Sequence, residues 1–185
     1  MLDAILQDTE LFALCRGECS ENNVCIEFDE LMAEDKFLIL KTDAYYSSSR
    51  MHNPPPSLDC LIVVECEMNP CYDFYLIEMK DIRSPDGFEV KNIRKKFATV
   101  IEDFLKNKFG HVFSNPDYCL NTFKLYFVSD ACRMKKKFPA MTQDEYRKKI
   151  LGTKYETFLS MKPFEFRGKK AMIDPRLPNP MIEVC

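Results

Sequence analysis

The stretch that decides the fold is residues 58–81, LDCLIVVECEMNPCYDFYLIEMKD. It contains two apolar runs, 58–67 and 74–81, and the Asn-Pro pair between them is a turn signal. Two such runs joined by a short turn predict an antiparallel β-hairpin. The end of the second run is unusual for a core strand, because Glu78 and Lys80 carry opposite charges on one face.

Alternation along the two strands predicts which side chains lie together. Asp59 and Leu61 share one face of the first strand, and Glu78 and Lys80 share one face of the second. A tight turn at Asn69-Pro70 places Asp59 opposite Lys80, so that Asp59 and Glu78 are diagonal neighbours about 5–8 Å apart at Cβ. A shift of the pairing by two residues keeps these faces together, whereas a shift by one separates them.

Two carboxylates at this distance repel each other unless a cation lies between them. Lys80 supplies one positive charge, and a divalent metal would supply two more through oxygen ligands. The peptide oxygen of Met79 is a further candidate ligand. The hairpin therefore predicts a metal site formed by Asp59, Glu78 and Met79.

The elements around the hairpin predict an α/β fold with a central mixed sheet flanked by helices. Ile93, Phe97 and Phe104 recur at helical spacing, and Thr142 with Glu145 forms a capping-box pattern. Residues 24–32 are either a hairpin partner of the next strand or a short helix. The remaining predictions are helices at 2–15, 90–109 and from 142, strands at 37–46 and 122–130, a strand or hairpin at 163–174, and an irregular segment at 174–180.

This order, together with Asp59 and Glu78-x-Lys80 on adjacent strands, resembles the PD-(D/E)XK nuclease superfamily. The resemblance covers about residues 1–130 and implies a restriction endonuclease-like αβββαβ core, with residues 131–185 as a basic extension of one domain spanning 1–185. The proline of the family motif is displaced, since Pro56 precedes Asp59 by three residues. The first helix of the family often supplies another acid, for which Glu10 is the candidate here.

The resemblance implies hydrolysis of phosphodiester bonds. Asp59, Glu78 and the Met79 carbonyl would hold Mg²⁺, for which Mn²⁺ can substitute, and the metal would activate a water. Lys80 would orient that water and stabilise the developing charge. The implied protein is an endonuclease of restriction or repair type that cuts DNA rather than RNA. The alternative is a catalytically inert nuclease-fold protein that acts as a nucleic-acid-binding or assembly module.

Charge is distributed unevenly along the chain. Residues 1–80 hold 5 Lys and Arg against 16 Asp and Glu, whereas residues 81–185 hold 21 against 13. An acidic half and a basic half are consistent with a cation site beside a track for a polyanion, although two solvated surfaces explain them equally well. The candidate contacts to nucleic acid are Arg94, Lys95, Lys96, Lys135, Lys136 and Lys137.

The nine cysteines and the N-terminal sequence bear on location. The first residues, MLDAILQDTE, do not have the pattern of a secretory signal, and no apolar run is long enough to span a membrane. We therefore expect a cytoplasmic, intracellular protein with reduced thiols. The spacing of Cys15, Cys19 and Cys25 does not match a zinc motif, and Cys60 and Cys66 are expected to be small hydrophobic residues of a strand. Many relatives in the family dimerise, so a homodimer stays open.

Overall fold

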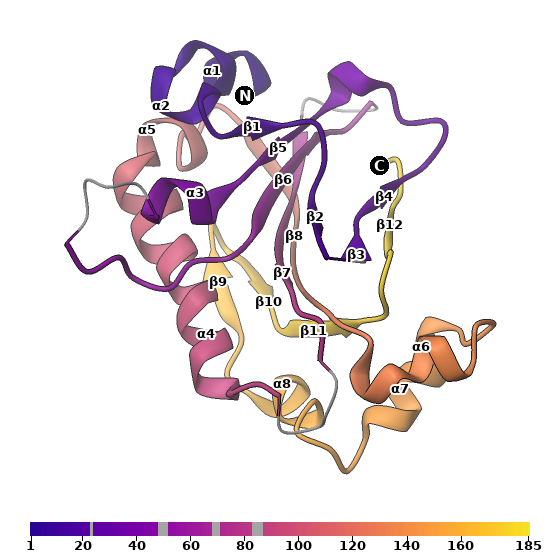
Figure 1. Ribbon diagram of the computed structural model, residues 1–185. Coiled ribbons are helices and arrows are strands. Elements are labelled where there is room, and N and C mark those ends of the chain that lie inside the picture. Colours follow the sequence, from indigo (N-terminus) through magenta and orange to yellow (C-terminus); the bar gives the residue numbers. More distant parts are fainter. Residues whose placement is uncertain (23, 48–51, 68–70, 83–86) are drawn as a thin grey trace.

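The computed structural model describes residues 1–185 except Asn23, residues 48–51, 68–70 and 83–86, and the side chain of Cys132. Its centre is a six-stranded mixed sheet in the order β1-β5-β6-β7-β8-β11 (Figure 1). Neighbours from β1 to β7 are antiparallel, whereas β8 is parallel to β7 and β11 is parallel to β8. The strands are β1 (Cys15–Arg16), β5 (Phe37–Leu40), β6 (Cys60–Glu65), β7 (Cys71–Met79), β8 (Cys119–Val128) and β11 (Ile173–Arg176). The predicted mixed α/β architecture is confirmed.

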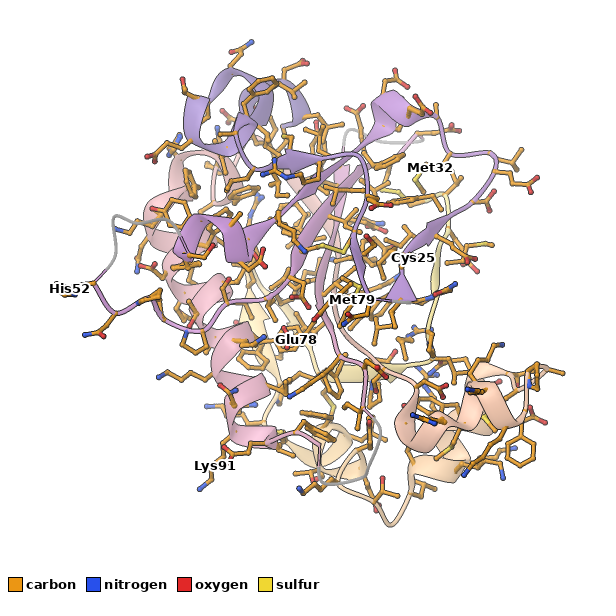
Figure 2. The ribbon with its side chains drawn as sticks, in the orientation of Figure 1. Cys25, Met32, His52, Glu78, Met79 and Lys91 are labelled. Atoms are coloured by element: carbon orange, nitrogen blue, oxygen red, sulfur yellow. A yellow bond between two sulfur atoms is a disulfide. The ribbon has the colours of Figure 1, made fainter. Side chains whose placement is uncertain are left out.

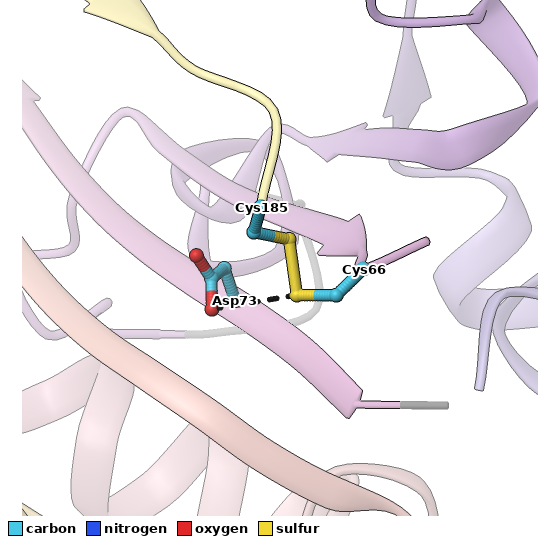
Figure 3. Close-up of side chains that lie close together, drawn as sticks. All are labelled: Cys66, Asp73 and Cys185. Atoms are coloured by element: carbon cyan, nitrogen blue, oxygen red, sulfur yellow. Dashed lines mark hydrogen bonds between the residues drawn. A yellow bond between two sulfur atoms is a disulfide. The ribbon is translucent and has the colours of Figure 1, made fainter. Parts of the chain in front are cut away.

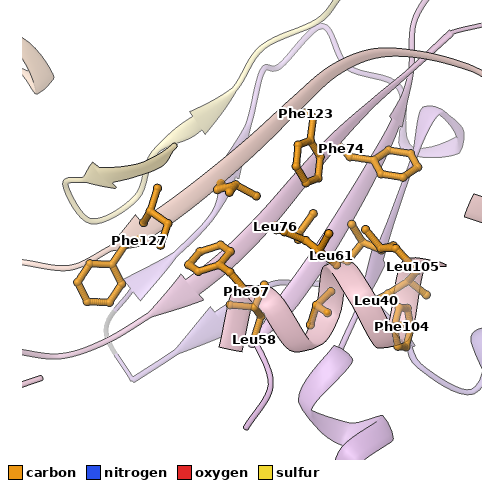
Figure 4. Close-up of a cluster of buried hydrophobic side chains, with 14 of the residues drawn as sticks. Leu40, Leu58, Leu61, Phe74, Leu76, Phe97, Phe104, Leu105, Phe123 and Phe127 are labelled. Atoms are coloured by element: carbon orange, nitrogen blue, oxygen red, sulfur yellow. The ribbon is translucent and has the colours of Figure 1, made fainter. Parts of the chain in front are cut away.

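The predicted long helix covers one face of this sheet. It begins as α4 (Val90–Ala98) and continues as the π-helical η2 (Thr99–Lys108). Phe97 and Phe104 are fully buried against Leu61 and Leu76, on the face that alternation predicts for these strand residues (Figure 4). The predicted helix 90–109 thus ends close to where it was expected, and a separate short helix, α5 (Gly110–Phe113), follows it.

The opposite face of the sheet buries a second apolar cluster that includes Ile62, Ile77 and Met79. Cys19 and Val24, from the N-terminal part of the chain, pack against it. Two small sheets lie in this region, β2 (Ser20–Glu21) with β3 (Val24–Cys25), and β4 (Glu27–Phe28) with β12 (Met181–Ile182). Residues 24–32 are thus neither a short helix nor a hairpin partner of the next strand.

The pairing of β6 with β7 differs from the predicted register by two residues. Cys60 lies opposite Ile77 and Leu61 opposite Leu76, so Leu61 is not opposite Glu78. The Cys66 N–H donates to the Cys71 carbonyl, and this is the last hydrogen bond between the two strands among the described residues. Four residues therefore connect the strands, instead of the two of a tight turn. The predicted turn at Asn69-Pro70 falls outside the described residues. A two-residue shift preserves the faces, so the grouping of side chains survives.

Two other boundaries are corrected. The predicted strand 37–46 ends at Leu40, and α3 (Thr42–Tyr46) follows, because the Thr42 hydroxyl donates to the Leu58 carbonyl and turns the chain. The predicted helix 2–15 is two helices, α1 (Leu2–Gln7) and α2 (Thr9–Phe12), because the Asp8 carboxylate accepts hydrogen bonds from two N–H groups of α2 and restarts the helix there.

The C-terminal part adds helices at one end of the sheet and a hairpin. The Thr142–Glu145 capping box is confirmed at the start of α7 (Gln143–Ile150). The predicted hairpin is β9 (Phe164–Phe166) with β10 (Lys169–Ala171), whereas Asp174-Pro175-Arg176, predicted to be irregular, lies in β11. The other elements are η1 (Glu34–Lys36), η3 (Ala131–Arg133), α6 (Met134–Lys137) and α8 (Glu156–Ser160). Among the described residues, no helix is long and apolar enough to cross a membrane.

Candidate metal centre

Asp59 and Glu78 face each other where β6 begins and β7 ends. Asp59 immediately precedes β6, and because Cys60 pairs with Ile77, the next residues outward are Asp59 and Glu78. They are therefore directly opposite rather than diagonal, and Lys80 is not the residue opposite Asp59. Both are buried, with exposed fractions of 9% and 2%. Figure 2 shows Glu78 and Met79 at this end of the sheet.

The Asp59 carboxylate is held by the backbone of the neighbouring strand. The Met79 N–H donates a hydrogen bond of 2.6 Å to Asp59 Oδ2. A carboxylate that accepts a backbone hydrogen bond is fixed in orientation, because the donor belongs to the sheet and not to a mobile side chain. Met79, predicted as a ligand through its carbonyl oxygen, thus contributes its N–H to the positioning of Asp59.

Glu78 is held by Lys96, which reaches it from α4. The Lys96 amine donates to Glu78 Oε1 over 2.6 Å. Ile93 and Phe97 direct one face of α4 to the core, and Lys96 lies beside that face. The second oxygen, Glu78 Oε2, is buried and has no hydrogen-bond partner among the described residues. A buried carboxylate oxygen without a donor is costly, so this atom marks a place where a cation would stabilise the protein.

The pKa values of the two acids are both raised. Burial raises the pKa of Asp59 to about 6, against the effect of the Met79 hydrogen bond. Burial, followed by the charge of Asp59, raises the pKa of Glu78 to about 8, against the effect of Lys96. The single positive charge of Lys96 thus does not balance the negative charges of the two buried carboxylates. A divalent cation with oxygen ligands fits this deficit.

Glu21 and Lys41 also act on this pair, and neither was predicted. Beyond the larger effect of burial, Glu21 raises the pKa of both Asp59 and Glu78, and Lys41 lowers that of Asp59. Glu21 belongs to β2, and the Cys19–Cys60 disulfide, with a Cα–Cα distance of 6.2 Å, links the residue before that strand to the residue after Asp59. The sequence carries no signal for this contact, because the pairing of nine cysteines cannot be derived from their spacing.

Of the two other predicted site residues, Lys80 lies near Glu78 and Glu10 does not. Lys80 directly follows β7, its N–H donates to the Val128 carbonyl, and its amine has no ion pair with any residue that the structure describes. Glu10 is exposed on α2. The N-terminal helices lie near the opposite end of β7, where the Met1 amine donates to the Tyr72 hydroxyl (Figure 1). The structure thus brings Lys80 to the end of β7 that carries Glu78, but not Glu10.

The predicted nucleic-acid contacts fall into two groups. On α4, Lys96 is committed to Glu78, and Arg94 donates to the Lys162 carbonyl and lies 4.5 Å from the Phe164 ring centroid, whereas Lys95 is exposed. On α6, the other three follow a turn that Asp130 organises. The first two, Lys135 and Lys136, line a cavity, and Lys137 is exposed.

Cys66, Asp73 and Cys185 form a second cluster with metal-ligand residue types. Their candidate ligand atoms all lie within 4.8 Å of one another (Figure 3). The two sulfur atoms are bonded to each other, and Asp73 Oδ1 accepts hydrogen bonds from Asn121 Nδ2 and the Thr122 N–H, both of 2.9 Å. Metals bind cysteine as thiolate, so the disulfide form of this cluster does not fit a metal.

The described residues form three disulfides, Cys19–Cys60, Cys66–Cys185 and Cys71–Cys119. Cys60 and Cys66 are therefore cross-linked and not the free apolar residues expected. Disulfides form and persist in oxidising compartments. The expectation of reduced thiols in a cytoplasmic, intracellular protein is contradicted, and the structure indicates an oxidising environment instead.

Comparisons with known proteins leave the family open. The chain matches no protein-family model, no curated protein and no solved structure. The arrangement of Asp59, Glu78 and Lys96 is therefore interpreted from its own chemistry.

Proposed function

We propose that this protein is a metal-dependent nuclease that hydrolyses phosphodiester bonds at the centre formed by Asp59 and Glu78. The observation that carries the proposal is the buried Glu78 Oε2, which has no partner in the described part of the chain although it lies opposite a second buried carboxylate. Such a pair is destabilising without a cation and is well suited to Mg²⁺, which prefers oxygen ligands.

The fold supports the same proposal. Apart from the two-residue strands β1 to β4 and the short helices η1, α3 and α5, the chain order is two N-terminal helices, then β5, β6 and β7, then the long helix, and then β8, which pairs in parallel with β7. This is the order of the αβββαβ core of the restriction endonuclease-like fold that the sequence resembles, and we propose that the chain has this core. The acids lie at the ends of two adjacent central strands, which hold them more rigidly than loops would.

The residues present fit a divalent metal. Asp59 Oδ1 and Glu78 Oε2 are the candidate ligands, since Asp59 Oδ2 already accepts from the Met79 N–H and Glu78 Oε1 from the Lys96 amine. When bound, Mg²⁺ would polarise the scissile phosphate and lower the pKa of a water. Met79 would hold the orientation of Asp59, and Lys96 would favour the ionised form of Glu78. The Lys80 amine would stabilise negative charge on the phosphate.

The expected substrate is DNA in preference to RNA, and this preference rests on the resemblance alone. Mn²⁺ is expected to replace Mg²⁺ because it uses the same ligands. A homodimer, which would allow both strands of a duplex to be cut, stays a prediction.

Cleavage of plasmid DNA with Mg²⁺ or Mn²⁺ tests the proposal. Asp59→Asn and Lys80→Ala should each lower the rate by at least about 100-fold, in the range that positioned acid–base and electrostatic groups contribute. Lys96→Ala should also lower it, whereas Lys91→Ala, at an exposed position of the same helix with no assigned role, should retain nearly the full rate. Activity unaffected by Asp59→Asn would overturn the assignment of the site.

The Lys96–Glu78 ion pair favours one alternative, a catalytically inert nuclease fold that acts as a nucleic-acid-binding or assembly module. In such a protein the amine itself is the resident cation of the site. The alternative predicts that the protein binds no Mn²⁺ and cleaves no DNA, and that Lys96→Ala is strongly destabilising because it leaves two buried acids uncompensated. Calorimetric titration with Mn²⁺ separates the two functions.

A further inference from the structure

A cavity of about 480 Å³ lies beyond the ends of the three parallel strands. Met79, Val128 and Arg176 are the last residues of β7, β8 and β11, and the chain after each strand contributes to the cavity wall, through Asp81, Asp130 and Pro178. The carboxyl ends of parallel strands are where α/β sheets bind ligands. The volume is in the range of small-molecule sites, which is about 300–1,000 Å³.

The wall of this cavity is basic where it meets solvent. Arg133, Lys135 and Lys136 line it. Asp130 accepts hydrogen bonds from the Lys135 N–H, at 2.7 Å, and from the Lys136 N–H, at 3.2 Å. The Asp130 carboxylate therefore accepts backbone hydrogen bonds from the same turn that carries the basic side chains. Asp81 is the other acid of the wall, so three cations and two carboxylates line the cavity.

The remaining wall offers apolar surface and an amide. Val24 is almost fully buried, and Pro178 is half-buried. Asn179 Oδ1 accepts from the Cys25 N–H over 3.2 Å, which attaches the Asn179 segment to β3 and leaves the Nδ2 group as a donor. Apolar surface with a few polar groups is how proteins bind the face and edge of a nucleobase, while cations bind its phosphate.

One residue of the wall has an unfavourable backbone conformation. Arg133 has a φ of 57°, in the left-handed region that arginine rarely adopts, whereas Asn179, with the same φ, is of a residue type that adopts this region readily. Such a conformation at a residue like arginine costs of order 1–3 kcal/mol and is found more often at ligand sites. The backbone at Arg133 is therefore consistent with a wall shaped for a ligand.

The cavity adjoins the candidate metal centre across the end of β7. Glu78 faces the side of the sheet that α4 covers, and Met79 faces the other side, with Val24. Lys80 follows directly, and Asp81 is already part of the cavity wall. A nucleic-acid backbone that crosses this strand end would meet Lys80 at the edge and the basic wall of the cavity beyond it.

We infer that the cavity binds one unstacked nucleotide of a single-stranded nucleic acid, next to the phosphate that the Asp59–Glu78 centre would hydrolyse. In a duplex the bases are stacked and paired, so filling such a cavity would require one to be extruded at a cost of a few kcal/mol. A single strand fills it without that cost. The position beside a scissile phosphate rests on the proposed function; the binding itself does not.

Binding is measured without metal, so that cleavage plays no part. A fluorescein-labelled oligothymidylate is titrated with the protein in EDTA, alone and as a duplex with oligoadenylate. The single strand should bind at least about tenfold more tightly than the duplex, and thymidine 5′-monophosphate should displace it at lower concentration than inorganic phosphate does.

The test variant combines Arg133→Gly with Lys136→Ala, and the control variant is Lys148→Ala. Glycine adopts a φ of 57° without strain, so Arg133→Gly removes the guanidinium without distorting the turn. The double variant Arg133→Gly with Lys136→Ala should weaken binding of the single strand by about tenfold or more, as loss of charged hydrogen bonds does. Loss of the exposed Lys148 on α7 should weaken binding by less than about twofold.

Equal binding of duplex and single strand, an equal effect of Lys148→Ala, or absence of binding to either would overturn the inference. Binding with the expected pattern in a protein that cleaves nothing with Mg²⁺ would retain the nucleotide site and reject the nuclease. Circular dichroism of each variant checks that it is folded.

Discussion

At the scale of single residues, the proposed metal site depends most on Glu78. Its identity and its face of the strand follow from the alternation of residues 74–81, and so does its grouping with Asp59. Its burial to 2% and its bond to Lys96 do not, because they depend on how α4 packs across the sheet. Lys96 was predicted as a surface contact for nucleic acid, since helical periodicity places it outside the apolar stripe.

The raised pKa values predict that stability without metal falls as pH rises. Asp59 and Glu78 ionise at about 6 and about 8 in the folded protein, and at their ordinary lower values when unfolded. Between those values the folded state binds more protons than the unfolded state. The free energy of unfolding should therefore decrease from about pH 4 to pH 8, by on the order of a few kcal/mol, and level off above.

Urea unfolding in EDTA at about pH 5 and pH 8 measures this difference. Glu78→Gln should be less sensitive to pH than the wild type, because glutamine does not ionise, whereas Glu27→Gln, an exposed acid on β4, should follow the wild type. Adding Mg²⁺ should stabilise the wild type more at the higher pH. Identical pH dependence of Glu78→Gln and the wild type would contradict the burial of an uncompensated acid.

At the scale of elements, hydrophobic periodicity predicted the core strands and the long helix. The register of the hairpin and the end of β5 were predicted wrongly, because long-range contacts determine them. The register of β6 and β7 was wrong by two residues because the connection is longer than a tight turn. The faces were still correct, since side chains alternate with a period of two. The strand predicted at 37–46 ends early because Thr42 bonds a carbonyl sixteen residues away, which no local pattern reveals.

The capping box of α7 is a local signal that the structure confirms, and it gives a prediction at this scale. Thr142→Ala removes the side chain that accepts from the Glu145 N–H, so the free energy of unfolding should fall by about 1 kcal/mol. Thr157→Ala, at an exposed position of α8, should have almost no effect. Equal effects of the two substitutions in urea unfolding would indicate that the cap does not stabilise α7.

At the scale of the whole molecule, disulfides connect segments that are distant in the sequence. Cys66–Cys185 closes a loop with a sequence separation of 119, and Cys19–Cys60 links the residue before β2, the strand of Glu21, to the residue after Asp59. Neither pairing was predicted, because the N-terminal sequence suggested reduced thiols and spacing alone does not define partners. The acidic residue Glu21 was missed for the same reason.

Removing the long-range disulfide should lower stability substantially. Cys66→Ala with Cys185→Ala is expected to reduce the free energy of unfolding by about 2–5 kcal/mol, since the open chain gains conformational entropy when unfolded. Cys15→Ala, at a cysteine without a disulfide, is the control and should change it little. Alkylation of the denatured, unreduced protein should leave the six cysteines of the three described disulfides unlabelled. Labelling of all nine would contradict the disulfides.

The central claim is that a divalent cation binds between Asp59 and Glu78, and an anomalous difference map from a crystal soaked in Mn²⁺ tests it most directly. We expect one strong peak about 2 Å from a carboxylate oxygen of each residue, with Glu78 Oε2 among the ligands. A map without a peak there, with the Lys96 amine still bonded to Glu78 as the only neighbouring cation, would contradict it.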